Sequence, residues 1–167
     1  STKTAEVTKP ILGVFYSGDV VIPETVTYRQ TTYTVTGIGE NAFTNRIFSN
    51  VTSVTLPATV TSIKKNAFND CDQLEAIVFN SEYPPALDEG ALNGVVGSDV
   101  TIQVPAEYAD NYQGSPWDDL NIAVEKDGVV YTYLKDGKTY DNAADRDGAN
   151  VYYTRTFNNT KWQPWYV

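Results

Sequence analysis

The chain has 167 residues, of which 41% are hydrophobic, and a formal net charge of −9. This length fits one domain or a domain with part of a second, and the composition excludes a wholly disordered chain. The negative charge disfavours nucleic acid and anionic membranes as partners, because both carry negative charge themselves. There is no His, which removes the commonest general base and metal ligand.

No run of about 18 apolar residues occurs, so the sequence predicts no membrane-spanning helix. The chain begins with Ser1 rather than Met. We therefore expect a processed or engineered chain, with any secretion signal upstream.

The first predicted element is a β-hairpin near the N-terminus. Residues 26–28 and 33–35 are rich in Val, Thr and Tyr and flank the polar residues 29–32. Strands of this composition around a short polar segment are typical of a hairpin. We expect it to cap the first unit of a repeat.

The repeat itself is visible in two matching segments. "VTGIGENAF" begins at Val35 and "VTSIKKNAF" begins at Val60, 25 residues later. A degenerate copy, "ALDEGAL", places Leu92 24 residues beyond Phe68. In this phase Val60 and Ile63 should point inward, and Phe68 should fill a corner of the core where a helical turn begins.

A second strand pattern interleaves with the first. "VTSVTLP", "LEAIVFN" and "VTIQVP" alternate apolar and other residues, which predicts short strands with one face buried. Two strands per period of about 24 residues indicate a coil, and single coils need neighbours for stability. The inward set should be Val54, Leu56, Ile77, Phe79, Ile102 and Val104.

These segments together resemble the BspA-like leucine-rich repeats of bacterial surface proteins, especially those of Bacteroidetes. The resemblance covers roughly residues 15–122. It implies a mainly β fold with short helical turns: a right-handed solenoid of about three coils. It also implies a secreted or cell-surface protein, associated with the outer membrane, of a family generally regarded as adhesins or host-interaction proteins.

The repeats should close with a cap. Residues 106–112 follow Pro105 and predict a short helix, since Pro favours helix starts. Trp117 should cover the final coil as a packing residue. We therefore expect residues 1–122 to form the solenoid with both caps.

Residues 123–167 predict a separate β-rich fragment. Strands are expected over 129–134, 151–157 and from 162 to the end, with Gly and Asp marking the turns. "VYYTRTFNNTKWQPWYV" resembles the opening of a β domain found after such repeats, and it stops within a strand at Val167.

Few residues of the sequence are candidates for metal binding or catalysis. Asp141, Asp145 and Asp147 match no calcium-loop spacing and are expected in a solvated turn. Cys71 has acidic neighbours, which argues for a structural thiol rather than a nucleophile. We expect no catalytic residue, no cofactor and no bound metal.

The predicted function is adhesion or protein binding. The outward strand residues should line the concave sheet as the binding surface: Ser53, Thr55, Ala76, Val78, Thr101 and Gln103. The expected partner is a host or bacterial surface protein or glycan, with no nucleic acid and no membrane insertion. The sequence does not determine the oligomeric state. Two alternatives remain: a structural spacer, and carbohydrate binding through exposed Tyr108, Tyr112 or Trp165.

Overall fold

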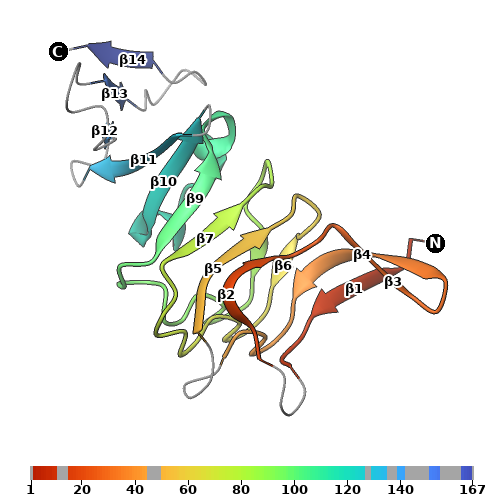
Figure 1. The fold of residues 1–167 in the computed structure, drawn as a ribbon. Coiled ribbons are helices and arrows are strands. Elements are labelled where there is room, and N and C mark those ends of the chain that lie inside the picture. Colours follow the sequence, from red (N-terminus) through yellow and green to blue (C-terminus); the bar gives the residue numbers. More distant parts are fainter. Residues whose placement is uncertain are drawn as a thin grey trace.

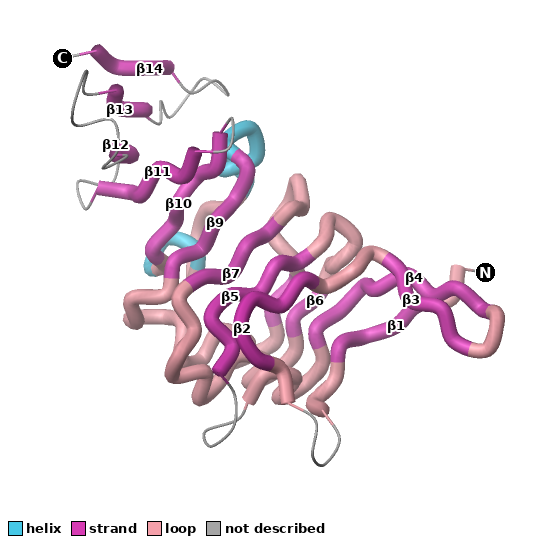
Figure 2. The backbone as a smooth tube through the Cα atoms, in the orientation of Figure 1, coloured by secondary structure: helices cyan, strands magenta, loops and turns pink. Residues whose placement is uncertain are grey.

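The structure is a computed structural model that describes residues 2–10, 15–44, 50–126, 129–134, 139–141, 151–154 and 163–166, with side chains as far as Val124. The first half contains β1 (Thr4–Val7), β2 (Ser17–Val21), β3 (Thr25–Tyr28), β4 (Thr31–Ile38), β5 (Asn50–Leu56), β6 (Ser62–Ile63) and β7 (Ala76–Phe79). The second half contains β8 (Ala86–Leu87), β9 (Thr101–Pro105), the 3-10 helices η1 (Ala106–Asn111) and η2 (Trp117–Asp119), β10 (Asn121–Lys126), β11 (Val129–Leu134), β12 (Thr139–Asp141), β13 (Val151–Thr154) and β14 (Gln163–Tyr166). Strands therefore dominate the described part of the chain (Figure 2), and the mainly β prediction is confirmed.

The strands form two sheets, and the coils of the repeat run between them (Figure 1). A five-stranded sheet has the order β1-β4-β6-β8, with β3 also paired to β4, and a nine-stranded sheet has the order β14-β13-β12-β11-β10-β9-β7-β5-β2. From β4 to β9 the chain alternates between the sheets. Each of the pairs β4/β5, β6/β7 and β8/β9 is thus one coil, so the predicted solenoid with two short strands per coil is confirmed.

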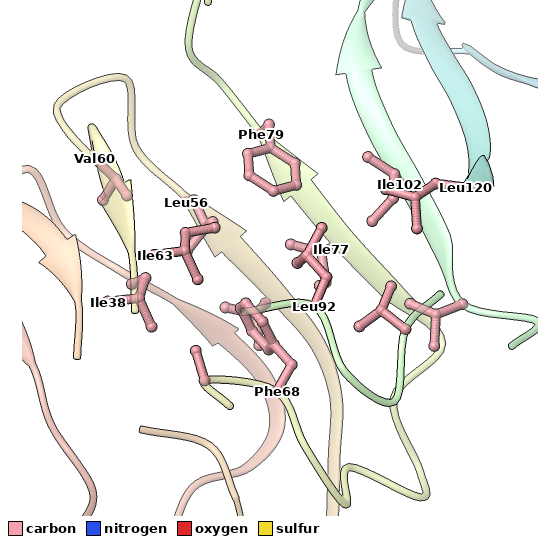
Figure 3. Packing of buried hydrophobic residues seen from close by; sticks show 14 of the residues in the cluster. Ile38, Leu56, Val60, Ile63, Phe68, Ile77, Phe79, Leu92, Ile102 and Leu120 are labelled. Atoms are coloured by element: carbon pink, nitrogen blue, oxygen red, sulfur yellow. The ribbon is translucent and has the colours of Figure 1, made fainter. Parts of the chain in front are cut away.

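The core lies between the two sheets, as the alternation in the sequence predicts (Figure 3). In each strand the inward residues are almost fully buried, with exposed fractions of 0–1% for Val54, Leu56, Ile77, Phe79, Ile102 and Val104. Parallel pairing puts Val54, Ile77 and Ile102 directly beside one another. The equivalent inward residues of neighbouring coils therefore stack along the solenoid, which is why coils stabilise one another.

A stack of large side chains fills the corner after β4, β6 and β8. The rings of Phe43 and Phe68 lie 5.3 Å apart and almost parallel, at 2°. Leu92 takes the same place in the next coil and is 4% exposed. Phe68 thus fills the corner as predicted, although residues 65–70 form a hydrogen-bonded turn rather than the start of a helix.

The same corner depends on a backbone conformation that most residues avoid. Asn41, Asn66 and Gly90 precede the stacked side chains by two residues and have φ angles of 55°, 56° and 72°. Only Gly, and to a lesser degree Asn and Asp, adopts this left-handed region readily. The N–H of Asn66 donates to the carbonyl of Gly90 at 3.1 Å, so the turn also links adjacent coils.

Replacing Asn66 by alanine is expected to lower the free energy of unfolding by about 1 kcal/mol or more, since a Cβ opposes positive φ. Asn66→Gly should be close to neutral. Urea denaturation followed by circular dichroism measures both. Equal losses in the two variants would instead implicate the side-chain hydrogen bond that Asn93 Nδ2 donates to Asn66 Oδ1 at 3.2 Å.

At the N-terminal end the predicted hairpin is present, with a shorter turn. β3 and β4 pair antiparallel, with Tyr28 opposite Thr31. Arg29 and Gln30 both have positive φ, at 46° and 64°, so the connection has two residues rather than the predicted four. The outermost strand of this sheet is β1, for which the sequence predicts no element; it pairs parallel with β4. The hairpin was expected to cap the first unit of the repeat, but it projects from the end of the molecule (Figure 1).

At the other end of the repeats, aromatic residues close the core. Trp117 is 5% exposed and packs edge-on against Phe79 and Tyr112, with ring centroids 5.5 and 5.1 Å away. The Tyr112 hydroxyl donates to the carbonyl of Ser81 at 2.9 Å. The predicted lid is therefore confirmed, and the predicted helix before it is the 3-10 helix η1.

The strands of the tail continue the nine-stranded sheet. β10 pairs parallel with β9, and β11 to β14 follow as antiparallel neighbours. The predicted strand at 129–134 has the bounds of β11, and the later two correspond to β13 and β14. The predicted boundary between residues 122 and 123 falls inside β10, so the division into two domains stays a prediction. Within the described residues, no helix is long and apolar enough to cross a bilayer.

Candidate binding surface

The outward side chains of five adjacent strands form two straight rows on the nine-stranded sheet. We call these the outer rows: Asp19, Ser53, Ala76, Thr101 and Asn121 in the first, and Val21, Thr55, Val78, Gln103 and Ala123 in the second. Each row takes one residue from each of β2, β5, β7, β9 and β10, which lie side by side in Figure 1. At about 4.8 Å between strands, the first row spans roughly 19 Å, enough to contact an extended segment of another protein. The accessible part of the second row ends at Gln103, because Ala123 is fully buried.

The structure brings together all six residues that the sequence predicts for this surface. Ser53, Thr55, Val78, Thr101 and Gln103 are half-buried, so their ends are accessible. The sixth, Ala76, is only 9% exposed, and its prediction as a contact residue is wrong. Its methyl group lies between Ser53 and Thr101 on the flanking strands, and these longer side chains shield it.

The edge of the surface formed by β2 is not among the residues that the sequence predicts for binding. Asp19 is exposed and accepts hydrogen bonds from Thr52 Oγ1 and Ser53 Oγ, both at 2.8 Å, on the same oxygen Oδ1. These hydrogen bonds hold the pKa of Asp19 below its ordinary value, with Ser53 the larger cause. Thr52 reaches Asp19 because the ladder between β2 and β5 contains an extra residue at this point.

The strand itself follows from the sequence, although its outward residues were not among those expected to bind. The apolar-x-apolar-Pro pattern of residues 20–23 matches that of residues 54–57, which aligns Val21 with Thr55. Val21 is 71% exposed. Alternation then places Asp19 on the same face, but the hydrogen bonds to two hydroxyls depend on the register shift, which the sequence does not reveal.

An acidic hollow lies at the margin of the outer rows. It has a volume of about 590 Å³ and shares Thr101 with them. Its acidic lining residues come from the turns before β7 and β9: Asp70, Asp72, Glu75 and Asp99. The surface and its margin are therefore negative, in keeping with the charge of the whole chain.

Cys71 also lines this hollow, and its environment makes it unreactive. Its thiol donates to the carbonyl of Phe43 at 3.3 Å. Desolvation, together with the nearby charges of Asp70 and Asp72, raises the pKa of Cys71 to about 12. The thiol is therefore neutral at physiological pH, as expected for a structural cysteine.

The other residues considered for binding are not gathered into a site. Tyr112 is fully buried, so its prediction as an exposed sugar platform is wrong, because it packs under Trp117 instead. Tyr108 is half-buried. The side chains of Trp165 and Asp141, together with Asp145 and Asp147, lie outside the described residues. Within the described part, no three His, Cys, Asp or Glu side chains are placed to hold a metal ion.

Comparisons with known proteins identify the repeat. No curated protein matches the sequence. A leucine-rich cell surface protein from Faecalibacterium prausnitzii, known from its crystal structure, is 18% identical with a TM-score of 0.40. The match covers 94% of this chain and 55% of that protein, so this chain spans about half of its length. The model of the BspA-type leucine-rich repeat region matches residues 22–110, with six copies. Because this match covers more than half of the sequence, the chain belongs to the BspA-type leucine-rich repeat family.

Proposed function

We propose that this chain is a non-catalytic module of a cell-surface protein and that it binds another protein across the outer rows. The observation that carries this proposal is the register of the rows over five strands, with accessible side chains in the second row from Val21 on β2 to Gln103 on β9. The buried residues between them hold the backbone rigid, so little entropy is lost when a partner binds. Repeat proteins commonly bind along such an extended sheet.

The charge of the surface supports a basic partner. Asp19 lies in the first row, and four carboxylates line the adjacent hollow. A protein surface rich in Lys and Arg would be attracted to this region, and the attraction would weaken as salt increases. Adhesion to a host or bacterial surface is the setting that fits a family associated with cell surfaces.

A protein partner is better supported than a glycan. Sugar binding commonly uses flat exposed aromatic rings, but the outer rows contain none. Their side chains are instead hydroxyls, amides, valines, alanines and the carboxylate of Asp19, which allow close approach of a partner's backbone and side chains. The absence of His from the sequence also supports a binding rather than a catalytic role.

A binding selection tests the proposal. Random peptides displayed on phage are selected on the immobilised chain and then tested on a triple variant, Thr55→Lys, Val78→Lys and Gln103→Lys. Selected peptides should be enriched in Lys and Arg, and the triple variant should bind them at least about tenfold more weakly, because it adds bulk and positive charge to the second row.

A charge-matched control distinguishes an effect of the outer rows from an effect of the chain's overall charge. The variant Thr32→Lys, Thr61→Lys and Tyr83→Lys adds the same charge at exposed positions outside the outer rows. It should bind within about twofold of the parent chain, since surface charges outside the contact act weakly. Equal binding by both triple variants would contradict the proposed surface and favour the spacer.

A further inference from the structure

The edge strands of the two sheets differ in how well they are protected from pairing with a strand of another molecule. Exposed sheet edges invite pairing, and bulges, charges, proline or short length discourage it. Among the described strands, β1 and β2 each lie beside a ladder irregularity and carry an acid, Glu6 and Asp19. β8 has only two residues, and β14 contains Pro164, which has no N–H. These four edge strands are therefore poorly suited to pairing.

β3 has four residues, twice the length of β8, and lacks the charge, proline and ladder irregularity of the other edge strands. Its sequence, Thr-Val-Thr-Tyr, contains no charge and no proline, and its ladder to β4 is regular. All four residues are exposed, and β4 is its one partner among the described strands. The hairpin projects from the body of the molecule, so its outer edge is accessible (Figure 1).

The hydrogen-bond pattern shows which groups this edge offers. The N–H of Val35 donates to the carbonyl of Glu24 at 2.8 Å. In an antiparallel pair such bonded positions alternate, so Val26 and Tyr28 also bond to β4. The N–H and C=O groups of Thr25 and Thr27 therefore point away from β4. A second strand could therefore form hydrogen bonds to four backbone groups of β3, the N–H and C=O of Thr25 and of Thr27.

We propose that β3 pairs antiparallel with β3 of a second copy of this chain, with Val26 on the two-fold axis. Thr25 of each copy then lies opposite Thr27 of the other, and each such pair exchanges two N–H···O bonds. The arrangement is symmetric, so the same patch serves both partners, as in most homodimers. The two hairpins together form one continuous four-stranded sheet.

The side chains of this edge are complementary to themselves in that register. The two Val26 side chains, each 39% exposed, meet at the axis, and Tyr28, 62% exposed, flanks them. The Arg29 guanidinium carbon lies 5.2 Å from the centre of the Tyr28 ring. Glu24 of the second copy lies opposite Tyr28 and so comes close to Arg29. The contact between the two β3 strands thus has an apolar centre and a pair of opposite charges, Arg29 and Glu24, at each end.

Disulfide trapping tests the register directly. In a Cys71→Ser background, Val26→Cys should form a disulfide-linked dimer under mild oxidation, because directly opposed non-bonded positions are about 4.5 Å apart at Cα. Thr32→Cys is the matched control: it is exposed on the same hairpin but lies on β4, away from the edge. Dimer from Val26→Cys alone supports the proposal. Equal yields from the two variants, or no dimer from either, overturn it.

A charge swap tests the same contact with the native cysteine in place. An interface of this size is weak, so sedimentation equilibrium should extend to roughly millimolar protein. Glu24→Arg or Arg29→Glu should weaken dimerisation about tenfold, because each places like charges together at both ends. The double variant should restore it. A chain that stays monomeric throughout, or a double variant as weak as the singles, overturns the proposal.

Discussion

Replacing Phe68 by alanine is expected to lower the free energy of unfolding by about 3–5 kcal/mol. The ring is fully buried and stacks on Phe43 at 5.3 Å. Its removal loses that contact and leaves a cavity at a corner shared by neighbouring coils. Urea denaturation monitored by circular dichroism measures the change, and a fall in the midpoint without a change in slope would show that stability alone is altered.

Phe68→Leu provides the control, since Leu92 occupies the same corner of the next coil and is also buried. Leucine fills most of the space, so the loss should be less than about 1.5 kcal/mol. If alanine cost no more than leucine, the corner would not be a closely packed part of the core.

Replacing Trp117 by alanine is also expected to lower the free energy of unfolding by about 3–5 kcal/mol. In this variant, however, the loosening should be confined mainly to one end of the solenoid. Trp117 packs against Phe79 and Tyr112 at the end of the repeat. In a solenoid each coil contacts only its neighbours, so loss of the lid should loosen the last coil first. Thermal unfolding measures the total effect, and amide hydrogen exchange should increase more in β9 and β10 than in β5.

Tyr83→Ala is the comparison for this variant. It removes an aromatic ring from the loop after β7, but Tyr83 is 65% exposed. Its effect should lie within about 0.5 kcal/mol of zero. A uniform rise in exchange across all strands of the Trp117 variant would mean that the solenoid unfolds as a single unit rather than from its end.

The repeat and its inward residues were predictable because they depend on local patterns. Alternation along a strand determines which side chains share a face, and the spacing of about 24 residues brings equivalent positions together. Val54, Ile77 and Ile102 are buried side by side for this reason. The same alternation placed Thr55, Val78 and Gln103 on the opposite face. Asn66 and Gly90 lie at matching positions of the repeat, and both residue types are typical of positive φ.

Other features depend on contacts between segments that no local pattern specifies. β1 forms a strand because β4 offers it an edge, and β10 crosses the predicted domain boundary because it pairs with β9. Ala76 is buried by its neighbours on β5 and β9 rather than by its own character.

The sequence by itself thus determined the solenoid, its family and the face that is available for binding. The tertiary structure alone decided which residues of that face are accessible, and that Asp19 joins Thr52 and Ser53 at its edge. The physical reason is that periodicity assigns a side chain to a face, whereas its exposure and hydrogen bonds depend on the register and size of side chains from other strands.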